Sequence, residues 1–318
     1  MKIIFCHTGR ALLPELFAYT KFASLYGISC DVVSYNELSK VSFSEYDILW
    51  NFMGRDVSFY DYIKLKKNNC LYIKEFASCS VKPFPKLKNF IKSFSLKKAD
   101  IEIYLNPLIE SEFVKLFSKV PSFYRDMGVS DSFFAARELH SSAPKNYDFV
   151  YVGAMDDSRR ISTELAKLVD KVECSVLLVG EPSLSEKSKL KDLPNVTITG
   201  RVPYEEVPNL LASAHIGLNI IPDEYPYNIQ TSTKLIEYLA LGIPVISNSY
   251  RWINEFVVQK EFSDSISIVD SFSDVNKIMF EELKKSSRSE PVLYQKTWDE
   301  VIKESGIFQY LIANIVVD

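Results

Sequence analysis

Short apolar segments that end in glycine or polar residues recur along this sequence, and they constrain its fold more than any other feature. The first covers residues 2–6, and a loop with Gly9 and Arg10 follows it. A helical segment at about 13–26 and a strand at 29–34 come next. This order is that of a parallel βαβ unit, whose loops after the strands build the ligand crevice. We therefore predict an α/β fold with candidate binding residues Gly9 and Arg10.

The same pattern continues in two series. Further strands are expected at 46–52, 70–74, 101–105, 120–124, 148–152, 175–179, 196–199, 216–220 and 243–246. The polar stretch 137–146 between the series indicates a linker. A length of 318 residues accommodates about two domains. We predict Rossmann-like domains at 1–140 and 146–297, with a C-terminal helix, 298–318, that returns to the first domain.

Composition narrows the class of protein. Hydrophobic residues make up 47% and charged residues 25%, which is typical of a soluble globular protein. A net charge of -4 excludes a globally basic nucleic-acid binder. The five cysteines form no CxxC pair and have no metal-ligand spacing with a histidine, so no metal site is predicted. The first apolar run is too short for a signal peptide, and we expect a cytoplasmic protein.

A lysine-rich segment lies between Lys64 and Lys98. It holds ten lysines and one acid, Glu75, a net charge of +9, with aromatic residues interleaved. This mixture suits an anionic membrane surface, or a polyanionic acceptor such as a lipid diphosphate. A solvated basic helix is the alternative. A peripheral position at the inner face of the membrane therefore stays open.

The stretch 230–249, QTSTKLIEYLALGIPVISNS, is the strongest local signal. Thr231, Ser232 and Thr233 precede a short apolar helix that Gly242 ends, so a capping hydroxyl is expected. A helix N-terminus offers free N–H groups and a partial positive charge, which suit a diphosphate. Glu237 lies one turn further and can accept two hydrogen bonds from a ribose diol. An ordinary capped helix with Glu237 on a solvated face is the alternative.

Three segments carry a resemblance to a known family. The segment VTITGRVP at 196–203, then EEVPNLLASAHIGLNIIP, then TKLIEYLALGIPVIS resemble glycosyltransferase family 4 in order and spacing. The similar part covers about 148–255. The resemblance implies the GT-B fold, two Rossmann-like domains that face each other across a cleft, and a retaining, nucleotide-sugar-dependent enzyme.

The resemblance also assigns roles to residues. Glu237 matches the second glutamate of the family's Glu-x7-Glu motif, which binds ribose, and the N–H groups of 231–233 hold the diphosphate. Gly200 belongs to the nucleobase loop. The predicted nucleotide- and donor-binding residues are Gly9, Arg10, Gly153, Gly180, Arg201, Val202, Thr231, Ser232, Thr233, Lys234 and Glu237.

Cations are expected beside the leaving diphosphate, because its negative charge grows in the transition state. The family's arginine falls on Ala154, and its lysine falls on Arg159 or Arg160, which become the predicted catalytic cations. Such a site works without a metal, and no cofactor besides the nucleotide sugar is expected. Glu75, after the fourth strand, is predicted to orient the acceptor hydroxyl or take its proton. Balancing neighbouring lysines is an equally open role.

The first glutamate of the motif falls on Ile229, which leaves the donor sugar open. Asp223, Glu224 or Asn228 from the same loop are candidates to replace it.

These residues predict a hexosyltransferase-type glycosyltransferase in cell-surface glycan synthesis, of the O-antigen or capsule kind. It would move a sugar from a nucleoside-diphosphate donor to a hydroxyl of a lipid-linked or polysaccharide acceptor. A non-catalytic GT-B module that binds a nucleotide or glycan is an alternative, which Ala154 and Ile229 favour. A nucleotide-sugar epimerase is a third, although only His7 among the histidines lies at an inferred crevice loop.

Overall fold

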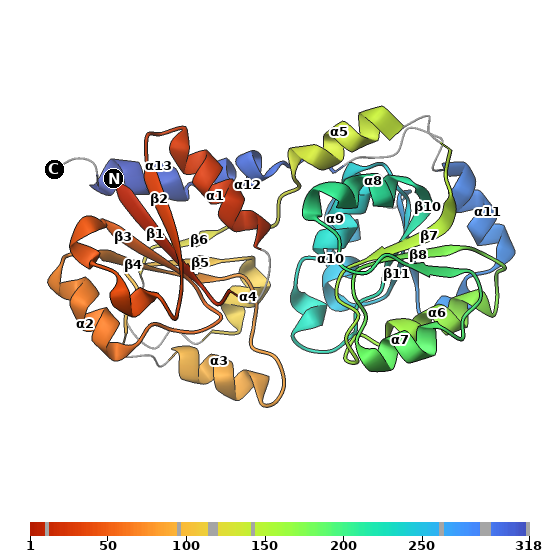
Figure 1. The fold of residues 1–318 in the computed structure, drawn as a ribbon, viewed down its shortest axis with the longest axis horizontal. Coiled ribbons are helices and arrows are strands. Elements are labelled where there is room, and N and C mark those ends of the chain that lie inside the picture. Colours follow the sequence, from red (N-terminus) through yellow and green to blue (C-terminus); the bar gives the residue numbers. More distant parts are fainter. Residues whose placement is uncertain are drawn as a thin grey trace. The chain divides into compact units, whose positions relative to one another are not determined.

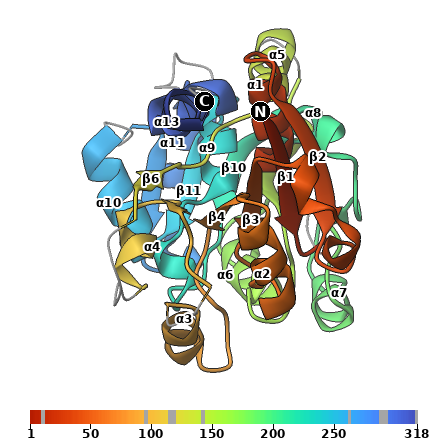
Figure 2. The same ribbon diagram turned by 90° about the vertical axis from the view of Figure 1, so that its left-hand side faces the viewer.

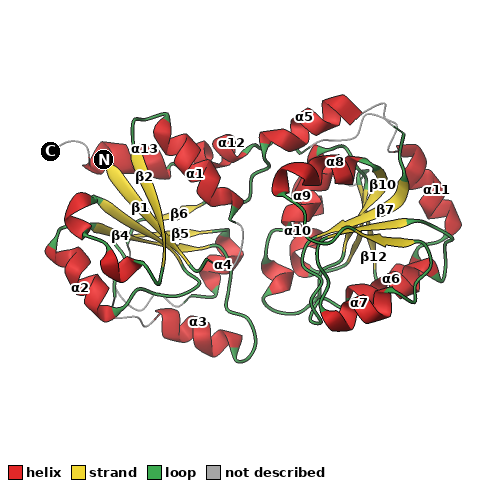
Figure 3. Ribbon diagram, in the orientation of Figure 1, coloured by secondary structure: helices red, strands yellow, loops and turns green. Residues whose placement is uncertain are grey.

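The computed structural model describes residues 1–9, 13–93, 97–113, 120–140, 144–260, 264–286 and 294–315. The chain divides into two compact units, each a parallel sheet covered by helices (Figures 1 and 3). Unit 1 comprises Met1–Gly128, Ile229–Thr231 and Lys296–Asp318, and unit 2 comprises Val129–Asn228 and Ser232–Gln295. No helix in the described part of the chain is long and apolar enough to cross a membrane.

Unit 1 has a six-stranded sheet in the order β2-β1-β3-β4-β5-β6. Its strands are β1 (Lys2–His7), β2 (Ser29–Ser34), β3 (Ile48–Phe52), β4 (Leu71–Phe76), β5 (Ile101–Tyr104) and β6 (Ser122–Tyr124). Its helices are α1 (Pro14–Ser24), α2 (Phe59–Lys67), α3 (Pro85–Ser93), α4 (Pro107–Ser111), α12 (Trp298–Ser305) and α13 (Ile307–Ile315). The order places β1 beside β3, with β2 on the far side of β1.

The predicted return of the C-terminal helix to the first domain is confirmed. Trp298 and Phe308 are buried in one apolar core with Tyr19 of α1 and Trp50 of β3. The return consists of two helices rather than the single one expected. Gly306 ends α12 in the left-handed conformation, at φ 72°, and α13 starts directly after it.

Unit 2 has the strand order β12-β11-β10-β7-β8-β9. Its strands are β7 (Tyr147–Val152), β8 (Val176–Val179), β9 (Val196–Ile198), β10 (Ala214–Asn219), β11 (Val245–Asn248) and β12 (Ile266–Val269). Its helices are α5 (Asp131–His140), α6 (Ile161–Val169), α7 (Leu184–Leu190), α8 (Val207–Ala212), α9 (Thr233–Ala240), α10 (Arg251–Lys260) and α11 (Lys277–Ser286). Strand β12 was not predicted.

Helix α5 corrects the predicted linker. Residues 137–140, expected in an irregular connection, form its last turn. The helix belongs to unit 2 by its contacts, and the ring of Phe133 on it packs at a tilt against the ring of Tyr204, with 5.9 Å between the ring centres. The contact division thus begins unit 2 at Val129, before the boundary predicted at residue 140.

Strand order fixes where each sheet binds ligands. In an open parallel sheet, ligands bind beyond the carboxyl ends of the strands, where the order reverses direction. In unit 1 that point lies between β1 and β3, and in unit 2 between β7 and β10. The loops at 8–13 and 53–57, and those at 153–160 and 220–232, are therefore the candidate site loops.

Candidate functional site

Helix α9 is held against the sheet of unit 2 by one buried tyrosine. The Tyr238 hydroxyl donates to the Val150 carbonyl at 3.2 Å and accepts from the Val152 N–H at 3.1 Å. Gly217 on β10 makes room for the ring, since a Cβ there would lie 2.6 Å from it. These contacts fix the N-terminus of α9 beside the carboxyl ends of β7 and β10.

That N-terminus has no side-chain cap, contrary to the predicted hydroxyl cap. Ser232 occupies the capping position, but its Oγ donates to Asn219 Oδ1 at 2.7 Å. Asn219, at the end of β10, in turn donates to the Ser247 and Tyr250 hydroxyls at 2.9 and 3.1 Å. The hydroxyl is therefore engaged elsewhere, which leaves the N–H groups of Thr233 and Lys234 available for an anion. The next N–H group, of Leu235, donates to the Ser232 carbonyl at 3.1 Å. Thr233 opens the first turn.

Lys234 stands in the first turn of α9 as a half-buried cation. Its Nζ lies 5.1 Å from the centre of the Tyr151 ring, a cation–π distance. Its side chain passes the backbone of Gly153, where an added Cβ would lie 3.7 Å from Lys234 Cε. Burial first, and then the neighbouring Arg159 charge, hold the pKa of Lys234 well below its usual value. Glu237 counteracts this lowering of the pKa.

The structure separates the two predicted catalytic arginines. The Arg159 guanidinium lies 5.0 Å from the centre of the Tyr227 ring, and its Nε is buried without a hydrogen bond in the described structure. Its nearest acid is Asp156, at 3.8 Å. The Arg160 side chain is 68% exposed and pairs with Glu224 at 3.6 Å. Arg159 therefore joins Lys234 at the site, whereas Arg160 is a solvated surface cation.

Glu237 is buried, at 5% exposure, so the alternative of a solvated face is wrong. Its Oε1 accepts a hydrogen bond from the Tyr204 hydroxyl at 2.9 Å. Burial raises the pKa of Glu237 to about 7, against the opposing effects of that bond and of the Lys234 charge. In this environment, ligand hydroxyls that donate hydrogen bonds to the carboxylate stabilise its ionised form.

Three glycine loops meet at the carboxyl ends of β7, β8 and β9. Gly180 has φ +141°, and a Cβ on it would lie 2.5 Å from the Gly153 carbonyl oxygen. Gly180 also pairs with Gly200 in an isolated bridge. Only glycine permits this approach, and the predicted residues Arg201 and Val202 follow directly, exposed and half-buried respectively.

Ile229 is 4% exposed in a short 3-10 turn, Tyr227–Ile229. A buried aliphatic side chain there cannot hold a sugar hydroxyl. Among the three candidate replacements, Asn228 donates to Asp223 Oδ1 at 3.1 Å. Its own Oδ1 is buried with no hydrogen-bond partner in the described structure. Asn228 therefore has an unused acceptor in this loop.

The structure contradicts the catalytic role predicted for Glu75. The residue is 1% exposed, and one of its oxygens pairs with the buried Arg125 guanidinium. The other oxygen accepts from Trp50 Nε1 at 2.7 Å, and Arg125 Nε donates to the Tyr19 hydroxyl at 3.0 Å. Both carboxylate oxygens are thus bound inside the core of unit 1. The alternative of balancing lysines is wrong as well, since the partner is an arginine.

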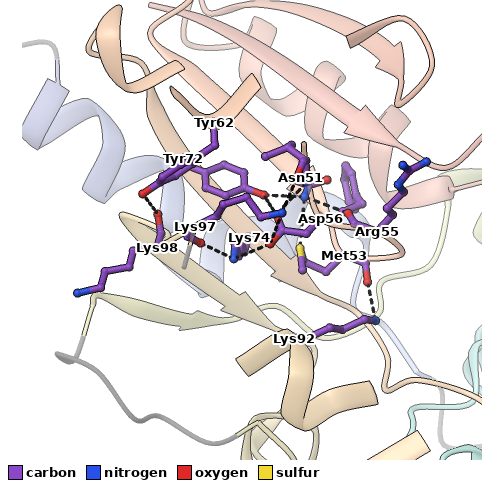
Figure 4. A network of polar contacts seen from close by, with 12 residues as sticks. Asn51, Met53, Arg55, Asp56, Tyr62, Tyr72, Lys74, Lys92, Lys97 and Lys98 are labelled. Atoms are coloured by element: carbon purple, nitrogen blue, oxygen red, sulfur yellow. Dashed lines mark hydrogen bonds and ion pairs between the residues drawn. The ribbon is translucent and has the colours of Figure 1, made fainter. Parts of the chain in front are cut away.

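The loop after β3 is held by a network of buried polar groups (Figure 4). Lys74, 4% exposed, donates to Asp56 Oδ2 at 3.2 Å and to the Lys97 carbonyl at 2.6 Å. The Tyr72 hydroxyl donates to the other Asp56 oxygen at 2.5 Å, and Asn51 donates to Tyr72 at 2.9 Å. Two lysines of the lysine-rich segment therefore have structural roles.

The loop after β1 is partly described. Gly9 adopts φ +70° and donates to His7 Nδ1 at 3.1 Å, whereas Arg10 lies outside the described residues. Gly54 of the β3 loop approaches Thr8, whose Cγ2 would lie 2.4 Å from an added Cβ. The two candidate loops of unit 1 thus lie side by side.

Sequence reasoning missed the aromatic residues of the unit 2 site, which are Tyr151, Tyr204 and Tyr227. Tyr151 is in β7, and the other two follow Pro203 and Pro226. An aromatic residue near a strand end is equally typical of a core, so the pattern gave no signal to separate the two.

Comparisons with known proteins agree with this geometry. Residues 146–272 match the model of a protein family described as "Glycosyl transferases group 1". No curated protein matches the chain in sequence.

Solved structures extend the likeness to the whole chain. Sucrose-phosphate synthase from Thermosynechococcus elongatus is similar at a TM-score of 0.69 and 14% identity, over 98% of this chain and 99% of that one. HepE from Anabaena, in complex with UDP, is similar at 0.68 and 11%, over 99% and 100%. WaaG, a glycosyltransferase involved in lipopolysaccharide biosynthesis, is similar at 0.58 and 12%, over 96% and 99%. The predicted fold, GT-B, is confirmed.

Proposed function

We propose that this chain, a glycosyltransferase of the GT-B type, transfers a hexose from a UDP-sugar to an acceptor hydroxyl with retention, as family 4 enzymes do. The observation that carries the proposal is the start of α9. Uncapped N–H groups, Lys234 and the buried Glu237 carboxylate occur there within about one helical turn, and the Arg159 charge acts on Lys234 from a neighbouring loop. UDP and UDP-glucose bound to HepE, which has the same fold, support uracil as the base.

In this proposal the diphosphate lies at the N-terminus of α9. The first-turn N–H groups and the helix dipole hold its oxygens, and Lys234 and Arg159 neutralise its charge. That charge grows as the sugar departs, so these fixed donors stabilise the transition state more than the bound donor. The family's arginine position is occupied by Ala154, which carries no charge, and Lys234 provides the second cation instead. No metal is required for this role.

The ribose of the donor lies at Glu237, whose carboxylate accepts from both ring hydroxyls. The ionised form is the one that binds, because a protonated carboxyl has fewer free acceptor sites. Asn228, with its unused amide oxygen, is proposed to hold a hydroxyl of the donor sugar in place of the glutamate that Ile229 lacks.

Unit 1 is proposed to bind the acceptor at the loops after β1 and β3. The acceptor class is a lipid-linked or polysaccharide hydroxyl, and the role is cell-surface glycan synthesis. A cytoplasmic location with peripheral contact to the membrane follows from that acceptor. The acceptor's base is not Glu75, since both oxygens of that residue are bound in the core.

The two neighbouring arginines give a matched test. We expect Arg159→Ala to lower turnover of UDP-glucose by about 10²–10³, the usual cost of one oxyanion donor. Arg160→Ala should stay within about threefold, because its side chain is a solvated surface group. Equal losses in the two variants would refute the assignment.

The same assay separates the alternatives. A non-catalytic module would be stabilised thermally by UDP yet show no transfer or donor hydrolysis. An epimerase would release an epimeric sugar, which sugar chromatography of the product detects.

A further inference from the structure

Helix α3 exposes the side chains that a surface helix normally buries. Leu87, Phe90 and Ile91 are 56%, 46% and 61% exposed, whereas Asn89 is 1% exposed. A surface helix in water turns its apolar stripe to the core and its polar stripe outward. In α3 this arrangement is inverted.

Polar contacts fix the helix in this orientation. Asn89 Oδ1 accepts from the Ser80 N–H at 2.9 Å, and Lys92 Nζ donates to the Met53 carbonyl at 3.2 Å. Figure 4 shows Lys92 pointing from α3 toward the β3 loop. Asn89 and Lys92 are three positions apart and share one helix face. The inversion is therefore held by specific bonds on the inner face.

The outer face combines apolar and basic side chains. At about 100° per residue, Leu87, Phe90 and Ile91 lie opposite Asn89, and Lys86 and Lys88 border them on either side. Both lysines are exposed, as are Val81 and Phe84 in the preceding loop, at 50% and 72%. The exposed Lys88 Nζ also donates to the Val81 carbonyl at 3.1 Å. Figures 1 and 2 both show α3 apart from α1, α12 and α13 of unit 1.

Several other lysines of the lysine-rich segment are paired or buried, although Lys67 and Lys98 are exposed. Lys66 forms an ion pair with Asp100 at 2.5 Å, and Lys74 is buried. Lys97 donates to the Val57 carbonyl at 2.6 Å. Helix α2 also exposes apolar side chains, Phe59, Tyr60 and Ile63, beside the exposed Lys67. Helix α3 differs in that an exposed lysine borders its apolar stripe on each side.

We propose that α3 and the loop before it, residues 81–91, dock unit 1 onto an anionic lipid bilayer. The apolar stripe would enter the boundary of the acyl chains, and the bordering lysines would extend to lipid phosphates. The proposal deepens the proposed function and rests on its lipid-linked acceptor, which the same bilayer presents. Because Lys92 ties α3 to the β3 loop, docking positions that loop at the membrane surface.

Co-sedimentation with vesicles tests the proposal. The full chain is expected to bind vesicles of phosphatidylcholine with about one third phosphatidylglycerol, and to lose binding in high salt. Leu87→Gln/Ile91→Gln should weaken binding at least tenfold. Leu184→Gln in unit 2 is the matched control, since Leu184 is 89% exposed. It should bind like the unchanged chain.

The charge component has its own variant. Lys86→Gln/Lys88→Gln should weaken binding to anionic vesicles by about fivefold for each lysine and leave binding to neutral vesicles unchanged. Lys187→Gln/Lys191→Gln, on exposed lysines of unit 2, is the control. Equal weakening in both double variants would overturn the role of α3.

Two further results would also overturn the proposal. One is unchanged vesicle binding by Leu87→Gln/Ile91→Gln. The other is a dimer in light scattering that becomes a monomer in Leu87→Gln/Ile91→Gln, together with no vesicle binding by the unchanged chain. In that case α3 would join two copies of the chain instead of docking on a bilayer. Donor hydrolysis in solution, measured on the same variants, should be unchanged. If hydrolysis is absent even from the unchanged chain, the proposed function fails while vesicle binding is still judged separately.

Discussion

Replacing Glu237 with glutamine removes one ionisation and leaves the side-chain shape almost unchanged. In the native chain the Tyr204 hydroxyl donates to Glu237 Oε1 at 2.9 Å. The amide oxygen of glutamine can accept the same hydrogen bond. The substitution therefore isolates the charge of the buried carboxylate. We predict that it stabilises unit 2 at alkaline pH and weakens nucleotide binding.

The magnitude follows from the pKa of Glu237, which burial raises from 4.5 to about 7. Between these values the folded state binds more protons than the unfolded state, so stability falls as the pH rises. The contribution of Glu237 is fully present below 4.5 and is lost as the pH passes through 7. A difference of one bound proton between the folded and unfolded states changes the free energy of unfolding by about 1.4 kcal/mol per pH unit. From about pH 5 to about pH 8.5, the unchanged chain should lose about 2.5 kcal/mol that Glu237→Gln does not lose.

Thermal denaturation at the two pH values measures this difference. The gap in Tm between Glu237→Gln and the unchanged chain should widen by about 5–10 °C toward alkaline pH, at about 2–4 °C per kcal/mol. Costs of the new amide do not depend on pH and cancel in the comparison. Glu205→Gln, on an exposed neighbour, is the control. A gap that is equal at both pH values would refute the buried ionisation.

Binding of UDP-glucose tests the same ionisation from the ligand side. Its diphosphate diester does not titrate near neutrality, so the pH dependence reports on the protein. With a pKa of about 7 for Glu237, affinity should be about tenfold weaker at pH 6 than at pH 8. Calorimetry would show weak binding at both pH values for Glu237→Gln. Pronounced pH dependence in that variant would contradict the ribose assignment.

Three further predictions concern Lys234, Glu75 and the effect of a chelator. Lys234→Met should weaken UDP-glucose binding at least tenfold in calorimetry and raise the Tm without ligand, because a half-buried cation of lowered pKa is removed. Glu75→Gln should lower the urea unfolding free energy by about 3–5 kcal/mol by leaving the Arg125 charge uncompensated, with UDP affinity unchanged. Turnover in a chelator should stay within about twofold, since helix N–H groups and cations supply the charge stabilisation; a larger loss would indicate a metal.

Sequence patterns predicted the central strands well because their burial leaves a plain signal. Strand β3 was expected at 46–52 and is found as Ile48–Phe52, with all five residues buried. Strand β12, with Ser267 between its isoleucines, is short and was missed. Helix α5 ends in the sequence RELH at 137–140, which is mostly polar and suits an exposed helix face as well as a linker. Composition cannot separate those two cases.

Site residues were harder to predict where a distant partner decides the environment. Glu75 stands near a strand end, where a polar residue often faces a crevice. Its partner Arg125 is 50 residues away, and only the packing of unit 1 brings them together. One hydroxyl of residues 231–233 was expected to cap α9. Ser232 occupies that position, but its hydroxyl donates to Asn219 across the sheet edge instead. Helix α3 was missed because its apolar residues face outward.

The charges at the start of α9 are arranged for a ligand rather than for each other. Lys234 and Glu237 are three positions apart, a spacing that commonly gives a pair, yet no ion pair joins them in the described structure. Burial lowers the pKa of Lys234 and raises that of Glu237, so each costs stability in the empty site. A diphosphate on the cation and a diol on the carboxylate would relieve both costs at once. Under the proposed function, nucleotide binding and the stability of unit 2 are therefore coupled, and removing either charge should stabilise unit 2 when no nucleotide is present.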